Sequence, residues 1–469
     1  MMRNDPVRTD PGPRGAARGR RGVSRGVSRV YRKAHTPPQR PGGFSGGAGR
    51  DGPRRGGAPA AEGDHERVCV VVLGKVRRPL GRAGLAAGAA VVMAAPAGTA
   101  SAAPPARVGD VQAALEEAAR TPGVVGVVGA AYVDGRLAGQ GSGGSRLLDG
   151  KGGRIPPGAR FRIGSQTKEM VATVVLQLVK EGRLGVDDKL ADLLPVVVEK
   201  DLVARAEDIT VRQMIRHTSG IPDWYAAKPN PDGSEGEEPA FDVFDFTTNY
   251  SPLDIVGWSR GRPRTGEPGE RYAYSNTNYT LLGMIIERVT GRDLATEMQG
   301  HLFGPLGMTR TYLPLKPPEG IRGPHGHGYY PDADGRLRDV DRFNASIAGA
   351  AGGVVSTARD MSVYKRAFVQ GRLLPPELQR VLTDRLPGGG GLAPQGAQGA
   401  LGGRGLAGGD LCGTFKVMGG TTAGYLAMTF YSDDGRREFA VSLTLSGKDI
   451  SRAGQAAGTA MERVFCPSS

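Results

Sequence analysis

The stretch "FRIGSQTKEM", residues 161–170, places Ser165 three positions before Lys168. Gly164 precedes the serine, and the apolar segment "EMVATVVLQLV" (169–179) follows the lysine. This pattern predicts a strand that turns into a helix at Ser165, with the hydroxyl at the positive end of the helix dipole. Residues one turn apart share a helix face, so Lys168 is expected beside Ser165. A lysine buried there could have a lowered pKa and take the serine proton.

Two other serines fit hydrolase patterns. Ser362 and Lys365 have the same spacing, and Ser45 in "GFSGG" fits the G-x-S-x-G nucleophile elbow. The preceding "STARDM" (356–361) predicts the capped start of a surface helix, which would leave Lys365 solvated. Ser45 lies in an Arg/Gly/Pro-rich segment. We therefore expect Ser165 to be the nucleophile; the alternative for it is an N-cap serine with an exposed lysine.

The charge of the chain is concentrated at its start. The 469 residues carry a formal charge of +14, but residues 1–103 hold 19 Lys/Arg against 6 Asp/Glu. The remaining body is nearly neutral, so a nucleic-acid partner is not expected for it. Residues 1–66 are rich in Arg, Gly and Pro, which is typical of a disordered tail or of sequence before a misplaced start. A nucleic-acid-binding arm is the less favoured alternative.

Residues 67–103 have the layout of a secretory signal. Basic residues occur at 75–82, an apolar stretch covers 83–97, and an A-x-A site lies at 100–102. The apolar stretch is too short and too rich in Gly and Ala to span a bilayer stably. We expect a secreted, extracellular and soluble mature protein without a stable membrane anchor.

The body, residues 104–469, begins and ends with strands and helices. Its patterns predict a helix at 108–122, a hairpin turning at Asp134-Gly135, a helix closed by Gly291, strands on both sides of Asp434-Gly435, and a last helix at 451–465. We expect an α+β fold in which sheet parts (about 104–186 and 351–469) flank an inserted, mainly helical part (about 187–350).

A second motif lies in the loop "GERYAYSNTNYTLLG" (269–283), which contains Tyr274 and Asn276, the only Tyr-x-Asn of the chain. A tyrosine here could relay a proton to a leaving group, and the asparagine could donate to a substrate carbonyl and to Lys168. Alternation along an extended segment places both side chains on one side. The alternative is an Asn-capped helix start beside a packing tyrosine.

With these motifs the chain resembles serine hydrolases of the β-lactamase superfamily, in the branch of class C β-lactamases and soluble D-alanyl-D-alanine carboxypeptidases. The resemblance extends to "VRQMIRHTSGI" (211–221), "AGGVVSTARDM" (351–361) and "GTFKVMGGTTAGYLAMTF" (413–430). It implies a β-lactamase/transpeptidase-like fold, an antiparallel sheet flanked by helices with a mainly helical insertion.

The resemblance also implies an acyl-enzyme route. Ser165 would attack an amide or ester carbonyl, with Lys168 and Tyr274 as base and Asn276 beside them. The N–H groups of Ser165 and Thr421 would form the oxyanion hole. His217 is expected to pack at a turn rather than to act as a base.

The third family motif departs from its pattern. The position of its cation falls on Met418, followed by Gly419, Gly420 and Thr421, the expected substrate-binding residues. Lys416, two residues away, would need a register shift to replace the cation. That cation helps to hold the free carboxylate of a peptide or β-lactam, so Met418 weakens the case for a carboxylate-ended substrate.

Cysteines and histidines add two expectations. Cys412 and Cys466 match the pair of secreted actinomycete carboxypeptidases, and in an exported chain we expect a disulfide between them, with two free thiols as the alternative. His325 and His327 lie in "PHGHGYY" (324–330). Two ligands without a third do not make a metal site, so neither a metal nor a cofactor is expected.

Three functions remain open. A secreted serine hydrolase of the D-alanyl-D-alanine carboxypeptidase type, acting on a small-molecule or peptide substrate such as a peptidoglycan stem peptide, is favoured by the extent of the resemblance. An esterase or amidase on the same fold is favoured by Met418. A non-catalytic penicillin-binding-like protein is disfavoured because Ser165, Lys168, Tyr274 and Asn276 are all present.

Overall fold

The computed structural model describes residues 108–225, 241–384 and 415–466. The predicted tail (1–66) and signal region (67–103) and Cys412 lie outside these ranges, so those predictions stay predictions. Within the described ranges, no helix combines the length and apolar character needed to cross a bilayer.

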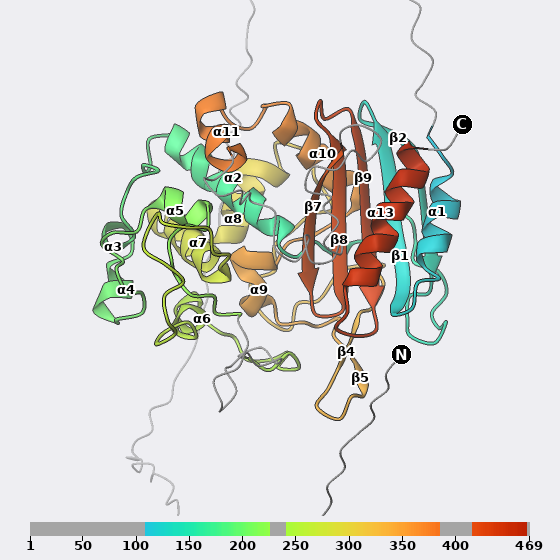
Figure 1. The fold of residues 1–469 in the computed structure, drawn as a ribbon, viewed down its shortest axis with the longest axis horizontal. Helices are drawn as coiled ribbons and strands as arrows, with labels where there is room; N and C mark the ends of the chain where they lie inside the picture. The colour runs from blue at the N-terminus through green and yellow to red at the C-terminus, as the bar shows by residue number, and fades with distance from the viewer. Residues whose placement is uncertain (1–107, 226–240, 385–414, 467–469) are drawn as a thin grey trace, which may run out of the picture. The chain divides into compact units, whose positions relative to one another are not determined.

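A five-stranded antiparallel sheet forms the centre of the fold, in the order β2-β1-β9-β8-β7 (Figure 1). Its strands are β1 (Val124–Val133), β2 (Arg136–Gly144), β7 (Phe415–Thr422), β8 (Tyr425–Ser432) and β9 (Arg437–Leu445). The first and last parts of the chain meet where β1 pairs with β9. The predicted β1–β2 turn is present, with Asp134 and Gly135 at φ values of 50° and 76°. The expected α+β fold with an antiparallel sheet is confirmed.

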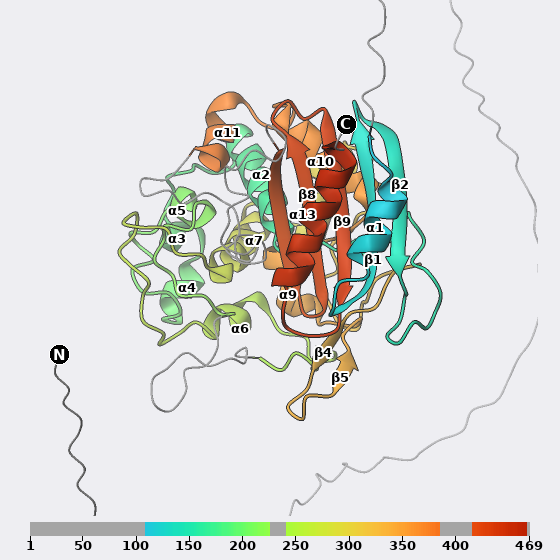
Figure 2. The same ribbon diagram turned by 45° about the vertical axis from the view of Figure 1, so that its right-hand side comes forward.

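Two terminal helices cover one face of the sheet (Figure 2). They are α1 (Val111–Ala118), whose N-cap Asp110 accepts the Ala113 N–H, and α13 (Ser451–Phe465). Their apolar sides pack on strand residues such as Phe430 to form a separate core. The two helices are the first and the last of the described residues, so burial of this face joins α1 to α13.

The larger core lies on the other face of the sheet, where α2 (Gln166–Lys180), α9 (Ala345–Gly352) and α10 (Ala358–Val369) pack. Beyond α2 lies α7 (Asn276–Thr290), which ends at Gly291 in the left-handed conformation, as its sequence predicts. The other helices are α3 (Leu190–Leu193), α4 (Pro195–Glu199), α5 (Val211–Ile215), α6 (Pro252–Gly257), α8 (Leu294–Met298), the π-helix Gln299–Phe303 and α11 (Pro376–Thr383).

Two short strand pairs connect these layers. β4 (Tyr329–Pro331) pairs with β5 (Leu337–Asp339) in a hairpin at the lower end of the sheet in Figure 1. β3 (Phe161–Arg162) pairs with β6 (Val355–Ser356). No sequence pattern predicts this second pair, because strands of two residues have no periodicity. It holds the Ser165 turn against the segment 351–356.

The prediction that Lys365 is solvated on a surface helix was wrong. Thr357 caps α10 as expected, but Ser362 and Lys365 are fully buried against α2 and the sheet. Lys365 Nζ lies 2.7 and 2.9 Å from the carboxylate oxygens of Glu169, and Ser362 donates to Glu438 at 3.0 Å. The two residues therefore belong to separate buried pairs and do not form a second nucleophile–base site.

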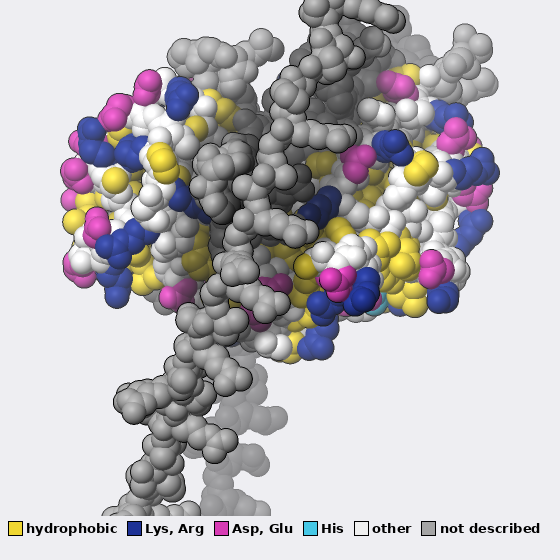
Figure 3. Space-filling model, turned by 60° about the horizontal axis from the view of Figure 1, so that its bottom comes forward, with side chains coloured by type: hydrophobic (Ala, Val, Ile, Leu, Met, Phe, Trp, Pro, Cys, Tyr) yellow, Lys and Arg dark blue, Asp and Glu magenta, His cyan; other side chains and the backbone are white. Residues whose placement is uncertain are grey.

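Charge on the visible surface is mixed. On the face drawn in Figure 3, basic and acidic side chains are interspersed with hydrophobic ones over the described residues. This distribution agrees with the near-neutral count of the body.

Candidate active site

Ser165 lies at the turn between β3 and α2, where it occupies the N-cap position. Its side chain makes no capping hydrogen bond, so the hydroxyl is available for other partners. The preceding Gly164 has a φ of +53°, a conformation that side chains with a Cβ rarely adopt. The sequence therefore folds here into a turn that leaves the serine hydroxyl free of a capping hydrogen bond.

Strand β7 lies directly against this turn. A Cβ on Gly164 would be 2.5 Å from Thr421 N, and a Cβ on Gly420 would be 2.1 Å from Ile163 O and 2.6 Å from Ser165 N. Only glycines permit this approach of two backbones. Ser165 and Thr421, which carry the two donors expected for the oxyanion hole, therefore lie on the two backbone segments that meet here.

Lys168 is buried below Ser165, with only 5% of its surface exposed. Its Nζ lies 3.2 Å from Ser165 Oγ and also donates to the carbonyl of Ala351 in α9. Burial lowers the pKa of Lys168 to about 7, although the charge of Asp223 opposes the shift. The alternative of an exposed lysine beside a capping serine does not fit this geometry. Near neutral pH a large share of Lys168 is the free amine and can accept a proton.

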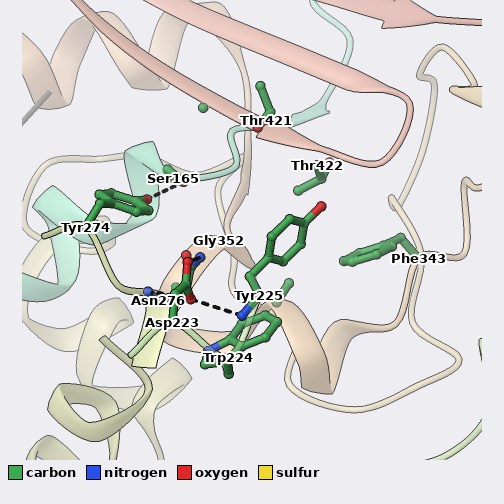
Figure 4. Close-up of a pocket in the computed structure, with 13 residues that line it drawn as sticks. Ser165, Asp223, Trp224, Tyr225, Tyr274, Asn276, Phe343, Gly352, Thr421 and Thr422 are labelled. Atoms are coloured by element: carbon green, nitrogen blue, oxygen red, sulfur yellow. Dashed lines mark hydrogen bonds between the residues drawn. The ribbon is translucent and has the colours of Figure 1, made fainter. Parts of the chain in front are cut away.

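Tyr274 completes the contacts of the serine. Its hydroxyl donates to Ser165 Oγ at 2.9 Å (Figure 4). Burial raises the pKa of Tyr274, so the phenol keeps its proton at neutral pH. Tyr274 is therefore a proton donor in this state, and Lys168 is the group able to accept the serine proton.

His217 supports Tyr274 from behind. Its ring stacks on the tyrosine ring at 4.4 Å, and its Nδ1 accepts the backbone N–H of Ser275 at 3.1 Å. Burial, with a smaller effect from Lys168, lowers the pKa of His217 well below its usual value. The imidazole is neutral and packs at a turn, and its contacts position the Tyr274 loop.

Asn276 begins α7 and has a different partner from the one expected. Its amide donates to Asp223 Oδ2 at 3.0 Å instead of to Lys168. Asp223 Oδ1 accepts the backbone N–H groups of Tyr225 and Asn276, both at 3.0 Å. Burial raises the pKa of the Asp223 carboxyl, and these hydrogen bonds partly offset the shift. All three donors are uncharged.

These groups surround a pocket of about 240 Å³ (Figure 4). Ser165 and Tyr274 lie on one side, Thr421 and Thr422 of β7 on another, and Asp223 with Asn276 on a third. The remaining wall is aromatic and apolar, and is formed by Trp224, Tyr225, Phe343, Ala348, Ala351 and Gly352. The described residues that line the pocket include no lysine or arginine.

The third-motif residues divide into two groups. Gly420 and Thr421 line the pocket, as expected for substrate-binding residues, whereas Met418 and Gly419 are not among its lining residues. Met418 is buried in the larger core. Lys416 is exposed and pairs with Asp433 at 2.7 Å, so it does not replace the missing cation.

Asp223 and the aromatic wall were not predicted from the sequence. Asp223 lies two residues beyond the "VRQMIRHTSGI" motif, and Trp224 and Tyr225 follow it directly. An acidic residue followed by two aromatic ones was the available signal. Phe343 had no comparable signal, because only the fold brings it to the pocket.

The arrangement is suited to acyl transfer. A serine oxygen contacts a lysine of lowered pKa and a protonated tyrosine, and the backbone of β7 lies against the serine turn. Together with the antiparallel sheet, this site defines a serine hydrolase-type protein of the β-lactamase and penicillin-binding group. The chain belongs to the beta-lactamase family: the family model "Beta-lactamase" matches residues 111–453.

Curated relatives match a part of the chain. It is 30% identical over 160 residues to "Protein flp" of Staphylococcus aureus (strain MW2), and 30% identical over 177 residues to "Penicillin-binding protein 4*" of Bacillus subtilis (strain 168). These matches cover 34% and 37% of this chain, and 29% and 35% of the relatives. The matched part thus spans about a third of the relatives' length.

Solved structures resemble the fold over a larger share. A D-stereospecific amidohydrolase from Streptomyces sp. is 29% identical with a TM-score of 0.60, covering 76% of this chain and 98% of that one. The D-amino acid amidase from Ochrobactrum anthropi SV3 is 22% identical with a TM-score of 0.57, covering 75% and 97%. At 22% identity, the likeness to the D-amino acid amidase shows the fold alone.

Proposed function

We propose that the protein is an amidohydrolase that forms an acyl-enzyme on Ser165 and takes amides of amino acids that carry a free α-ammonium group. The observation that carries this proposal is the Asp223 carboxylate, which lines the pocket and whose hydrogen-bond donors are all uncharged. A buried carboxylate is stabilised by an opposite charge; the charge of Lys168 acts on Asp223 without a hydrogen bond among the described contacts, and a substrate ammonium would supply a direct partner.

The shape and charge of the pocket agree with this substrate class. Trp224, Tyr225 and Phe343 offer an apolar wall for one side chain. Since no lysine or arginine is among the described residues that line the pocket, a substrate carboxylate beside the scissile bond would lack a charged partner there. The likeness to the D-stereospecific amidohydrolase supports a preference for the D configuration.

The proposed reaction uses the described contacts. Neutral Lys168 takes the Ser165 proton as Oγ attacks the amide carbonyl, and the N–H groups of Ser165 and Thr421 bind the oxyanion. Tyr274 donates a proton to the leaving amine and is reprotonated from Lys168. Water then cleaves the Ser165 ester by the reverse set of proton transfers, which releases the amino acid.

A carboxypeptidase acting on D-alanyl-D-alanine peptides is the second candidate. Its support is the partial match to a penicillin-binding protein of Bacillus subtilis. The uncharged β7 side of the pocket, formed by Gly420, Thr421 and Thr422, disfavours it. The two candidates share the Ser165 chemistry and differ in whether the substrate presents an ammonium or a carboxylate to the pocket.

The test compares four substrates: D-phenylalanine amide, its L form, its N-acetyl derivative and a D-alanyl-D-alanine peptide. We expect the free D-amide to be cleaved fastest and the N-acetyl derivative to lose about 10- to 100-fold in kcat/KM, the range for a hydrogen bond to a charged group. Asp223→Asn should lower kcat/KM for the free D-amide by a similar factor and leave kcat/KM for the N-acetyl derivative almost unchanged.

Two controls accompany this comparison. Ser165→Ala should abolish turnover of every substrate while the fold is retained, and Asp242→Asn, at an exposed carboxylate outside the pocket, should change nothing. Faster cleavage of the D-alanyl-D-alanine peptide than of the amide would select the carboxypeptidase. Equal cleavage of the free and acetylated amides would refute the role of Asp223.

We also propose that the protein acts outside the cell. The support is the order of basic, apolar and A-x-A segments within residues 75–102. N-terminal sequencing of protein from the culture medium of a native-like host should find a start shortly after residue 102. Retention of the whole chain inside the cells would contradict export.

A further inference from the structure

A histidine pair and two carboxylates meet at the base of the β4–β5 hairpin. His325 and His327 precede β4, while Asp339 ends β5 and Asp341 follows it. Pairing of Tyr329 with Asp339 in this hairpin brings the two segments together (Figures 1 and 2). The two imidazole rings stack at 5.0 Å with an angle of 11° between them.

Hydrogen bonds fix which ring nitrogens carry protons. His325 Nδ1 lies 2.6 Å from the carbonyl oxygen of Gly323, and His327 Nδ1 lies 2.7 Å from Asp339 Oδ2. Both partners are acceptors, so each Nδ1 carries a proton. In the neutral form of each ring, Nε2 is then the nitrogen with the lone pair. A carbonyl or carboxylate behind the ring is the arrangement that orients metal-binding histidines.

The contact between His325 and Asp341 is unusual for a hydrogen bond. His325 Nε2 and Asp341 Oδ1 are 2.8 Å apart, but both atoms are buried and neither has a partner in hydrogen-bonding geometry. His325 is only 8% exposed, so bulk water does not satisfy the nitrogen. Two ligand atoms of one Zn²⁺ ion, each about 2.0–2.2 Å from it, are separated by about 2.8–3.6 Å at angles between 90° and 109°. The observed 2.8 Å lies at the lower end of that range.

We propose that His325, His327 and Asp341 bind a divalent metal ion, with Zn²⁺ as the best match to two imidazoles and one carboxylate. One ligand atom from each of these residues lies within 4.8 Å of the other two. Asp339 orients His327, and Gly323 orients His325. No metal is expected from the sequence because the two histidines lack a third ligand there. The hairpin supplies that ligand as Asp341, 14 positions after His327.

The role of this ion is to brace the pocket wall. The Arg162 guanidinium donates to the backbone carbonyl of Asp341, and Arg162 lies in β3, directly before the Ser165 turn. Phe343, two residues after Asp341, lines the pocket. An ion held by Asp341 would fix the segment that leads to Phe343. The proposed ligands are not among the residues that contact Ser165 Oγ, so the role we assign to the ion is structural.

The experiment uses the untagged full chain, treated with a chelator and then titrated with Zn²⁺ in a calorimeter. We expect one ion per chain at equivalence, a count confirmed by elemental analysis, and an increase of a few °C in Tm when the ion is in large excess over its Kd. Co²⁺ in place of Zn²⁺ should give a spectrum of nitrogen and oxygen ligation without thiolate charge transfer, which excludes cysteine as the ligand source.

Variants separate this site from ordinary His–carboxylate pairs. His327→Gln and Asp341→Asn should each remove the stoichiometric ion and the Tm increase, and Asp339→Asn should weaken binding by about 10- to 100-fold. The control is His301→Gln. His301 lies 3.2 Å from Glu297 and 3.3 Å from Glu181 and so forms another cluster of a histidine with two carboxylates. Absence of stoichiometric binding, or binding unchanged in His327→Gln and Asp341→Asn, would show two separate His–Asp pairs and overturn the proposal.

Discussion

The hydroxyl of Tyr274 lies 2.9 Å from Ser165 Oγ, while Lys168 approaches the same oxygen at 3.2 Å. The serine oxygen thus accepts from a phenol whose pKa is raised by burial, next to an amine whose pKa is lowered to about 7 by burial. Removal from water disfavours the charged form of each group. It therefore raises the pKa of Tyr274, whose charged form is the phenolate, and lowers the pKa of Lys168, whose charged form is the ammonium. Ser165 Oγ therefore contacts both a proton donor, Tyr274, and a proton acceptor, Lys168.

Removal of the phenol tests its role as proton donor. We expect Tyr274→Phe to lower kcat/KM by about 10²- to 10⁴-fold, the usual effect of losing a general acid or base. The ring and its stacking on His217 remain, so the fold should be retained by circular dichroism. Tyr272→Phe is the matched control, because Tyr272 contacts the same histidine edge-on, with 5.8 Å between the ring centroids. Similar losses in both variants would argue for a packing role alone.

The lowered pKa of Lys168 predicts the pH dependence of acylation. Only the free amine can take the Ser165 proton, so kcat/KM for a p-nitrophenyl ester should rise with pH through an apparent pKa of about 7 and then level off. The charge of Asp223 favours the ammonium form of Lys168. Asp223→Asn should therefore shift this rise to lower pH. A shift to higher pH would contradict the electrostatic link.

The same shift has a consequence for stability. The pKa of Lys168 is about 7 in the folded protein and close to 10.5 in the unfolded chain, so the unfolded chain binds more protons between these values. The free energy of unfolding should therefore rise with pH across this window. Lys168→Met should remove this contribution and stabilise the protein near pH 7, as measured by urea unfolding at several pH values. An unchanged pH slope would mean that Lys168 is not desolvated.

The sequence predicted those features that follow from local patterns. The Ser165 turn, the helix closed by Gly291, the hairpin at Asp134-Gly135 and the terminal helices depend on periodicity, caps and turn residues. The nucleophile, the lysine and the tyrosine were identified by spacing and motif, and the structure brings all three together.

The parts that the sequence did not predict depend on long-range contacts. The burial of Lys365 follows from its pairing with Glu169, which lies 196 positions away. The pairing of Asn276 with Asp223 and the approach of Phe343 to the pocket likewise join distant segments. No local pattern distinguishes these residues from a solvated lysine, a helix cap or an ordinary core phenylalanine.

The contact between Gly420 and the Ser165 turn is open to a single-methyl test. Gly420→Ala would place a Cβ 2.1 Å from Ile163 O and 2.6 Å from Ser165 N, both of them backbone atoms, so the turn must move. Because a 1 Å displacement at a reacting centre can cost about 10²-fold in rate, we expect at least that loss in kcat. Gly300→Ala is the control, since no described atom lies within 4 Å of the position that a Cβ would take there. Full activity of Gly420→Ala would show that β7 does not form part of the oxyanion site.

The buried pair of Lys365 and Glu169 should contribute strongly to stability without taking part in the reaction. Lys365 is fully buried, which alone would lower its pKa, but Glu169 and Tyr431 together raise the pKa above its ordinary value. Lys365→Met leaves Glu169 in α2 without its counter-charge, and loss of one partner from a buried pair typically costs about 3–5 kcal/mol. Lys416→Met removes an exposed pair with Asp433 and should cost less than about 1 kcal/mol. Urea unfolding of both variants measures the difference.

The double variant Lys365→Met/Glu169→Leu should recover part of the loss, because no unpaired charge remains. Equal, small costs for the two single lysine variants would show that Glu169 finds water or another partner once Lys365 is removed.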